Sequence, residues 1–179
     1  MINKRLAVLV GLSFLAASGW SFGAENRHGV GFGIDSATLD SDTLPVPLDF
    51  TGFTLFGKIG FTDNWGLLIS LRDMEDDELL LGGEEDSYTQ IGVHAVYMWR
   101  PNRLVRPHVK FGIARTDFDA KIPGNPTLSD DGAGISIGGG LEAGTQKVAF
   151  FGDVDATVVS LFNEDFAIGD MTLGIIFKF

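Results

Sequence analysis

The C-terminal stretch Asp170-Met171-Thr172-Leu173-Gly174-Ile175-Ile176-Phe177-Lys178-Phe179 alternates between large apolar residues and polar or small ones. The large apolar side chains occupy every second position: Met171, Leu173, Ile175, Phe177 and Phe179. Ile176 is the one exception among the intervening positions. Successive side chains of a β-strand point to opposite faces of its sheet, so a period of two is typical of a strand. The stretch therefore predicts a strand with one apolar and one polar face.

The same alternation recurs in seven earlier segments, near residues 28–37, 50–61, 65–72, 88–100, 105–114, 133–143 and 148–158. Phe56 and Phe151 interrupt the polar sets of their segments. Short turns are expected near 62–64, 101–104 and 144–147, and longer polar connections at about 38–49, 73–87, 117–132 and 160–167. The segments are long enough for the roughly 9–11 residues of a tilted transmembrane strand. The pattern predicts an all-β fold, an eight-stranded antiparallel up-and-down transmembrane β-barrel, because a closed sheet leaves no edge unpaired in lipid.

An exported soluble sandwich or lipocalin-like barrel would show the same period, so the chemistry of the two faces has to decide. The polar set is rich in glycine and other small residues, which suits the crowded interior of a narrow eight-stranded barrel. Aromatic residues fall near strand ends, as they do at membrane interfaces: Phe61, Trp65, Tyr97, Trp99 and Phe179. These two features favour the membrane barrel.

The composition excludes several other classes of protein. The 179 residues include no cysteine, which excludes disulfide scaffolds, thiol catalysis, Cys-ligated zinc and a lipoprotein anchor. Acidic residues number 24 against 13 Lys and Arg, and this balance argues against a nucleic-acid partner, since phosphate neutralisation needs clustered bases. A hydrophobic content of 45% is too high for a disordered acidic chain.

The N-terminus has the features of an export signal. A basic n-region precedes an apolar core over residues 6–17, and small residues follow the core. Residues 1–23 are therefore predicted to be a signal peptide, cleaved after Gly23 or Ala24, and residues 24–179 to form the barrel. A retained membrane anchor is the alternative, but this apolar core is shorter than the roughly 20 residues that span a bilayer as a helix.

Four motifs lie in order along the predicted barrel: Phe61-Thr62-Asp63-Asn64-Trp65-Gly66, Arg106-Pro107-His108-Val109-Lys110-Phe111-Gly112-Ile113, Gly138-Gly139-Gly140-Leu141-Glu142 and Leu173-Gly174-Ile175-Ile176-Phe177-Lys178-Phe179. Together they resemble the OmpA-type superfamily of small eight-stranded outer-membrane β-barrels of Gram-negative bacteria. The resemblance implies an integral outer-membrane location among outer-membrane lipid and lipopolysaccharide. It also implies that the assembly machinery reads the last strand, with Phe177 and Phe179 as the assembly signal. The family includes adhesins, weak pores and proteins of other roles, so the resemblance implies fold and location rather than activity.

The alternation also assigns eight charged or titratable side chains to the barrel interior: Lys58, Arg72, His94, His108, Lys110, Glu142, Asp153 and Asp155. Buried charges are stable only when they are paired, so we expect a mutually neutralising network that plugs the lumen. Glu142 is expected to pair with Lys58 or Lys110. A pore lined by the same residues is the alternative interpretation.

No catalytic site is predicted. Histidines and serines in the strands could in principle form a lipid-hydrolysing site, but no motif places them together: His28, His94, His108, Ser70 and Ser136. Asp153 and Asp155 share one face of a strand, and the sequence supplies no partner base that would make them a catalytic pair.

No metal site or cofactor is predicted either. The acidic runs at 73–78 and 84–86 have the ligand type that Ca²⁺ or Mg²⁺ prefers, but their spacing matches no EF-hand loop. Solvated acidic loops, facing outward from the cell, are the favoured interpretation.

The sequence thus favours a non-enzymatic structural or surface-interaction protein, with the barrel as anchor and acidic loops as its exposed face. A passive small-solute or ion channel is the alternative. A lipid-modifying outer-membrane enzyme is the second alternative.

Overall fold

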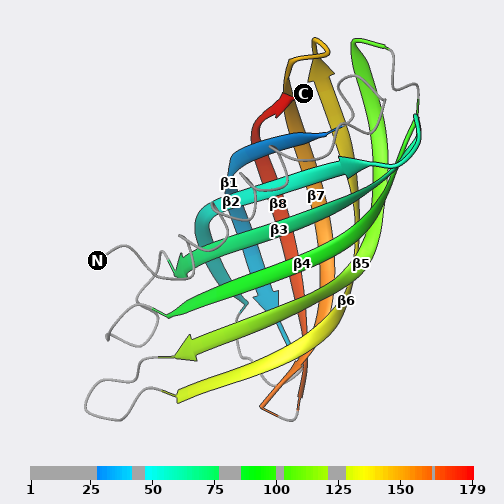
Figure 1. Ribbon diagram of the computed structural model, residues 1–179. Coiled ribbons are helices and arrows are strands. Elements are labelled where there is room, and N and C mark those ends of the chain that lie inside the picture. Colours follow the sequence, from blue (N-terminus) through cyan, green and yellow to red (C-terminus); the bar gives the residue numbers. More distant parts are fainter. Residues whose placement is uncertain (1–27, 42–46, 77–85, 100–102, 121–127, 163) are drawn as a thin grey trace.

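In the computed structural model, the described residues 28–41, 47–76, 86–99, 103–120, 128–162 and 164–179 form eight strands (Figure 1). The strands are β1 (Gly29–Asp40), β2 (Leu48–Gly60), β3 (Trp65–Asp76), β4 (Ser87–Met98), β5 (Val105–Ala120), β6 (Leu128–Gly144), β7 (Val148–Leu161) and β8 (Glu164–Lys178). No helix within the described residues is long and apolar enough to cross a membrane. The predicted signal peptide, residues 1–23, lies outside the described residues.

The eight strands close into a barrel in sequence order, and every strand is antiparallel to both neighbours. Closure joins β1 to β8 in a continuous register from Gly29↔Lys178 to Asp40↔Ala167. Two further backbone hydrogen bonds, of 3.3 and 3.0 Å, connect His28 with Phe179 just beyond these strands. A closed sheet has no edge, so its backbone groups are satisfied within the sheet. The predicted eight-stranded up-and-down barrel is confirmed.

The two ends of the barrel differ. At the turn end, short connections at 61–64, 99–104 and 145–147 join successive strands, close to the predicted places. Both barrel termini, His28 and Phe179, lie at this end, which is at the upper right of Figure 1. The opposite end, where the other four connections lie, is called the loop end below.

The strands extend further toward the loop end than predicted. The expected long connection at 160–167 is wrong, because β7 and β8 leave only residues 162 and 163 between them. The acidic residues at 73–76 belong to β3 rather than to a loop, whereas 77–78 and 84–85 lie outside the described residues. The connections expected at 38–49 and 117–132 are likewise partly strand.

The physical reason is an apolar core inside these strand extensions. This loop-end core consists of Ala37, Leu39, Phe50, Met74, Tyr88, Phe118, Val159, Leu161, Phe166 and Ile168. The Phe50 ring packs edge-to-face against Tyr88 and Phe118, with ring centroids 5.1 and 6.2 Å apart. Burial of these side chains stabilises the extended strands by the hydrophobic effect and keeps the sheet paired where the sequence appears loop-like.

The outer face changes sharply from apolar to polar along each strand. On β5 it passes from Ile113, which is 66% exposed, to Arg115, and on β6 from Ile135, 73% exposed, to Asp131. The polar outward positions at the loop end form an outer rim. Among the described residues, Arg115 is the one base of this rim. Its acids are Asp40, Asp49, Asp73, Glu75, Asp117, Asp119, Asp131 and Asp165. The broad exposed apolar band between this rim and the turn end is the surface that a lipid-embedded barrel requires.

Aromatic residues mark the turn-end border of the apolar band. The rings of Trp65, Tyr97 and Trp99 form a ladder on the outer face, with successive centroids 5.0 Å apart. Their amphipathic rings suit the interface between lipid and water. The ladder therefore lies where the membrane border is expected on this side of the barrel.

The three exceptions to the alternation share one cause. Phe56, Phe151 and Ile176 all point inward and, with Ala149, form an apolar cluster in the turn-end half of the lumen. The rings of Phe56 and Phe151 meet edge-to-face at 4.8 Å. Inward-facing Gly31 leaves the space that the Phe56 ring occupies, because a Cβ there would collide with that ring.

The outer-face assignment predicts a depth-dependent cost for charge. Replacing Ile137 of β6, 64% exposed in the apolar band, with Arg should destabilise the barrel by about 2–4 kcal/mol if it lies near the bilayer midplane. Urea unfolding in lipid vesicles measures the change. Ser129→Arg, outward on the same strand but in the outer rim, is the matched control. Equal costs at the two positions would contradict the assignment.

Candidate functional site

The lumen is the part of the barrel where charged side chains gather. The structure places the eight sequence-predicted residues on inward-facing positions: Lys58, Arg72, His94, His108, Lys110, Glu142, Asp153 and Asp155. Seven of them are buried, and the Lys58 side chain retains 15% exposure. They divide into two ion clusters, and His94 stands apart.

The first cluster, the middle cluster, surrounds Arg72 of β3. Its guanidinium forms an ion pair with Asp155 and, at 3.0 Å, another with Asp170. Asp35 lies 3.6 Å from Nε. Neutral side chains complete the surroundings: Arg72 donates to Gln90 at 2.8 Å, and the Tyr88 hydroxyl donates to Asp170 at 3.0 Å. The arrangement surrounds a buried cation with carboxylates from several strands at once.

Lys110 of β5 completes the middle cluster. Its Nζ lies 2.6 Å from Asp153 and 2.9 Å from Asp155, both on β7. His108 Nε2 lies 3.0 Å from the other oxygen of Asp153. The two carboxylates that could resemble a catalytic pair are therefore each engaged by cationic or imidazole groups.

Glycines on β6 make these contacts possible. Gly138 and Gly140 stand between Lys110 and His108 on β5 and the two aspartates on β7. A Cβ at Gly138 would collide with the Asp155 carboxylate, and one at Gly140 with that of Asp153. The Gly-rich motif thus lets charged side chains meet across an intervening strand.

The second cluster, the turn-end cluster, centres on Glu142 of β6. Its carboxylate pairs with Lys58 at 3.2 Å, with Arg106 at 2.9 Å and with Lys178. The Arg106 guanidinium also donates to the turn carbonyls of Arg103 and Thr145, at 3.4 and 3.2 Å. Of the two partners expected for Glu142, Lys58 pairs with it, whereas Lys110 is directed to β7.

Four charged members of the network were not among the predicted site residues: Asp35, Arg106, Asp170 and Lys178. All four lie on inward positions of strands whose alternation was already visible, so that alternation was the signal that could have identified them. Their partners could not be found this way. Pairing across the lumen depends on strand tilt and stagger, which a period of two does not contain.

The charges of the lumen balance overall but not locally. The lumenal ion pairs of the described residues join five bases with five carboxylates, if histidine is neutral. The turn-end cluster has three bases and one acid, a net charge of +2. The middle cluster has Arg72 and Lys110 against four aspartates, a net charge of −2. A cavity of about 30 Å³ touches both clusters and exceeds the roughly 10–15 Å³ that one water needs.

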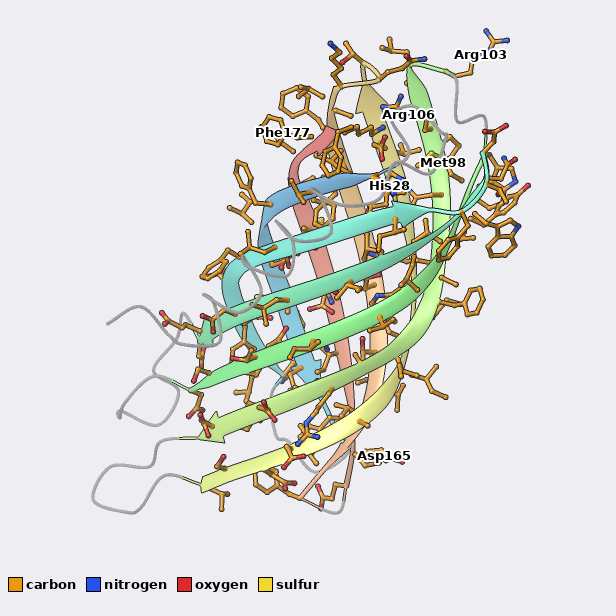
Figure 2. All side chains as sticks on the ribbon, viewed as in Figure 1. His28, Met98, Arg103, Arg106, Asp165 and Phe177 are labelled. Atoms are coloured by element: carbon orange, nitrogen blue, oxygen red, sulfur yellow. The ribbon has the colours of Figure 1, made fainter. Side chains whose placement is uncertain are left out.

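The remaining candidates for chemistry are separate from these clusters. His94 is buried, and neither ring nitrogen has a hydrogen-bond partner among the described residues. Ser136 is also buried with its hydroxyl unpartnered, and His28 lies at the turn end (Figure 2). Within the described residues no group of three or more His, Cys, Asp or Glu side chains could hold a metal ion.

The two residues of the predicted assembly signal lie on the outer face at the turn end. Phe177 is 45% exposed and pairs across the sheet with Val30 and Val148. Phe179 is 46% exposed, and its backbone N–H donates to the carbonyl of His28 at 3.0 Å. Both rings are therefore accessible from outside the barrel.

Comparison with known proteins identifies a family and several solved structures with the same fold. The sequence matches the model of the family described as "Outer membrane protein beta-barrel domain" over residues 6–179. No curated protein matches the sequence significantly.

Solved structures share the barrel. Neisserial surface protein A (NspA) is 12% identical, with 86% of this chain and 97% of that chain covered and a TM-score of 0.75. Ail, the attachment invasion locus protein of Yersinia pestis, is 19% identical, with 87% and 100% covered and a TM-score of 0.62. The outer membrane enzyme PagL is 15% identical, with 82% and 99% covered and a TM-score of 0.52. At these identities the likeness concerns the fold alone.

The middle cluster predicts a large effect of removing its central base. Arg72→Met should destabilise the barrel by about 3–5 kcal/mol, because it leaves buried carboxylates without their counter-ion. Arg115→Met is the matched control. Arg115 pairs with Asp131 at 2.7 Å on the outer rim with 63% of its side chain exposed, so its loss should cost about 0–1 kcal/mol. Urea unfolding in detergent compares the two, and similar midpoints would contradict a structural role for the network.

Proposed function

The chain belongs to the family of outer membrane protein β-barrel domains, and from this premise we propose a non-enzymatic structural or surface-interaction role for it. It is an integral protein of the outer membrane. In the proposed role the barrel is a plugged anchor, and its loop end is the face that meets the cell exterior.

The filled lumen is the observation that carries the proposal. Along the axis, the turn-end cluster, the inward aromatic pair and the middle cluster precede the loop-end core, in which Phe50 and Met74 are fully buried. A hydrated ion would have to pass apolar side chains and paired charges. This supports a plug rather than a passive channel.

The surroundings of the candidate catalytic groups support a non-enzymatic role. His94 and Ser136 are buried inside the barrel, away from the lipid-facing surface where a membrane-lipid substrate would lie. PagL is an enzyme with the same barrel fold, so the fold alone does not decide between the two roles. Lipid modification remains the alternative, and it would change the mass of lipid A.

The outer rim supports an interaction role for the loop end. It presents eight carboxylates and one arginine among the described residues, and several of them are held by neighbouring strands: Thr38 donates to Asp49 at 2.8 Å and Ser160 to Asp165 at 2.6 Å. NspA is a neisserial surface protein and Ail an attachment invasion locus protein, which agrees with this role. Lipopolysaccharide is the proposed neighbour of the rim.

Two further parts of the proposal concern biogenesis. The signal peptide is cleaved after Gly23 or Ala24 on export, and the assembly machinery recognises the last strand through Phe177 and Phe179. The exposed positions of both rings support this recognition.

The plugged lumen predicts a silent barrel. Purified protein inserted in planar bilayers should give no steady single-channel conductance, and a general porin inserted under the same conditions serves as the positive control. Lipid A isolated from cells that express the protein should keep its mass. Steady conductance would favour the channel, and a mass change would favour the enzyme.

The orientation predicts which end can be labelled from outside the cell. The sequence has no cysteine, so single substitutions give one thiol each. Asp165→Cys in the outer rim should react with a membrane-impermeant maleimide on intact cells, whereas Lys147→Cys at the turn end should react only after lysis. Asp165 lies at the lower end of Figure 2, opposite Arg103 and Phe177. The reverse labelling pattern would contradict the proposed exposure of the loop end.

A further inference from the structure

The turn-end cluster has more positive charge than its carboxylate can neutralise. Lys58, Arg106 and Lys178 converge on Glu142, and all four side chains are at most 15% exposed. Figure 2 shows Arg106 at this end of the barrel. Buried charge without a counter-ion is costly, so a net charge of +2 in this position calls for a further partner.

The nearest carboxylates cannot serve as that partner. Asp153 and Asp155 already bind Lys110, and Asp155 also binds Arg72. The inward aromatic pair Phe56 and Phe151 lies on strands β2 and β7 between the levels of the two clusters. The carboxylates of the middle cluster are thus already engaged by their own bases, and the turn-end cluster keeps its excess of positive charge.

Donors remain available in the cluster. Each lysine ammonium has three N–H donors. Within the described residues the ammonium groups of Lys58 and Lys178 each donate one hydrogen bond, in both cases to the Glu142 carboxylate. A ligand with acceptor capacity and negative charge would satisfy the others.

The adjoining cavity has the room for such a ligand, and its lining combines charged and polar side chains with apolar ones. Lys58, Glu142, His108 and Thr172 are among its lining residues. The hydroxyl of Thr172 and Nδ1 of His108 are buried and have no hydrogen-bond partner among the described residues. The space of about 30 Å³ fits a water-sized species rather than an organic molecule.

We propose that the turn-end cluster binds a small inorganic anion, of the size of chloride, in the cavity that Lys58 lines. The anion enters from the turn end and brings the cluster closer to neutrality. The four cluster side chains face the lumen, so a free ion rather than a lipid headgroup is the ligand. The proposal is independent of what the loop end binds.

The first test uses the wild-type barrel in a nonionic detergent without phospholipid. Sodium gluconate is replaced by sodium chloride at constant ionic strength, and the urea midpoint of unfolding is recorded. Chloride should raise the midpoint to a saturating value, since a ligand that binds only the folded state stabilises it by mass action. A midpoint that does not depend on chloride would overturn the proposal.

Three lysine variants locate the effect. Lys58→Met and Lys178→Met should raise the half-saturating chloride concentration about tenfold or more, because each removes one positive charge from the cluster that attracts the anion. Lys147→Met removes the same charge from an exposed turn at the same end and should leave it unchanged. A similar chloride response in all three would mean general screening and would also overturn the proposal.

Glu142→Gln separates a binding site from a purely structural ion network. This variant raises the net charge of the cluster from +2 to +3. It should unfold at lower urea than the wild type in gluconate, yet need less chloride for half-saturation. A network without an anion site predicts the first result and not the second, so loss of the chloride response in this variant would contradict the site.

Discussion

The pairing of β1 with β8 is the constraint on which the rest of this structure depends. In the hydrocarbon of a bilayer no water is available to satisfy an exposed strand edge, so the sheet must close. The register from Gly29↔Lys178 to Asp40↔Ala167 achieves this. With eight strands, closure produces a lumen so narrow that side chains fill it. Every inward side chain must then fit the limited volume of the lumen, and every inward charge must find a partner of opposite sign.

The lumen meets both requirements with successive layers of apolar and charged side chains along the barrel axis. An apolar core at the loop end buries Phe50 and Met74, and next to it, toward the turn end, Arg72 and Lys110 hold four aspartates. In such an arrangement long side chains extend across an intervening strand. The positions they cross must carry no side chain of their own. Gly138 and Gly140 supply that space. Glycines that could be mistaken for a phosphate-binding loop are therefore part of the charge network itself.

The sequence predicts the faces of this barrel better than its ends. Period-two alternation follows directly from strand geometry, and applied to every strand it could also have placed Asp35 and Asp170 inside, although neither was among the predicted residues. The exceptions Phe56, Phe151 and Ile176 could not be interpreted from one strand alone, because they form a contact among three strands. The acids at 73–76 suggested a loop because strand residues beyond the lipid have loop-like chemistry on their outward side. Met74, an apolar residue among these acids, indicated a strand instead. Its importance becomes clear only from the packed loop-end core, in which it is buried.

The partners of Glu142 show why side-chain pairing lies beyond the pattern. Lys58, Lys110 and Lys178 all have the correct parity to point inward, so parity cannot choose among them. Tilt and stagger bring Lys58 and Lys178 to Glu142, whereas the gap at Gly138 directs Lys110 toward β7. The same geometry separates the lumenal ion pairs of the described residues, which balance in total, into two clusters of opposite sign. The lumenal ion pairs can therefore balance one another while the barrel presents a cationic interior at one end and a carboxylate-rich exterior at the other, which makes its two ends suited to different neighbours.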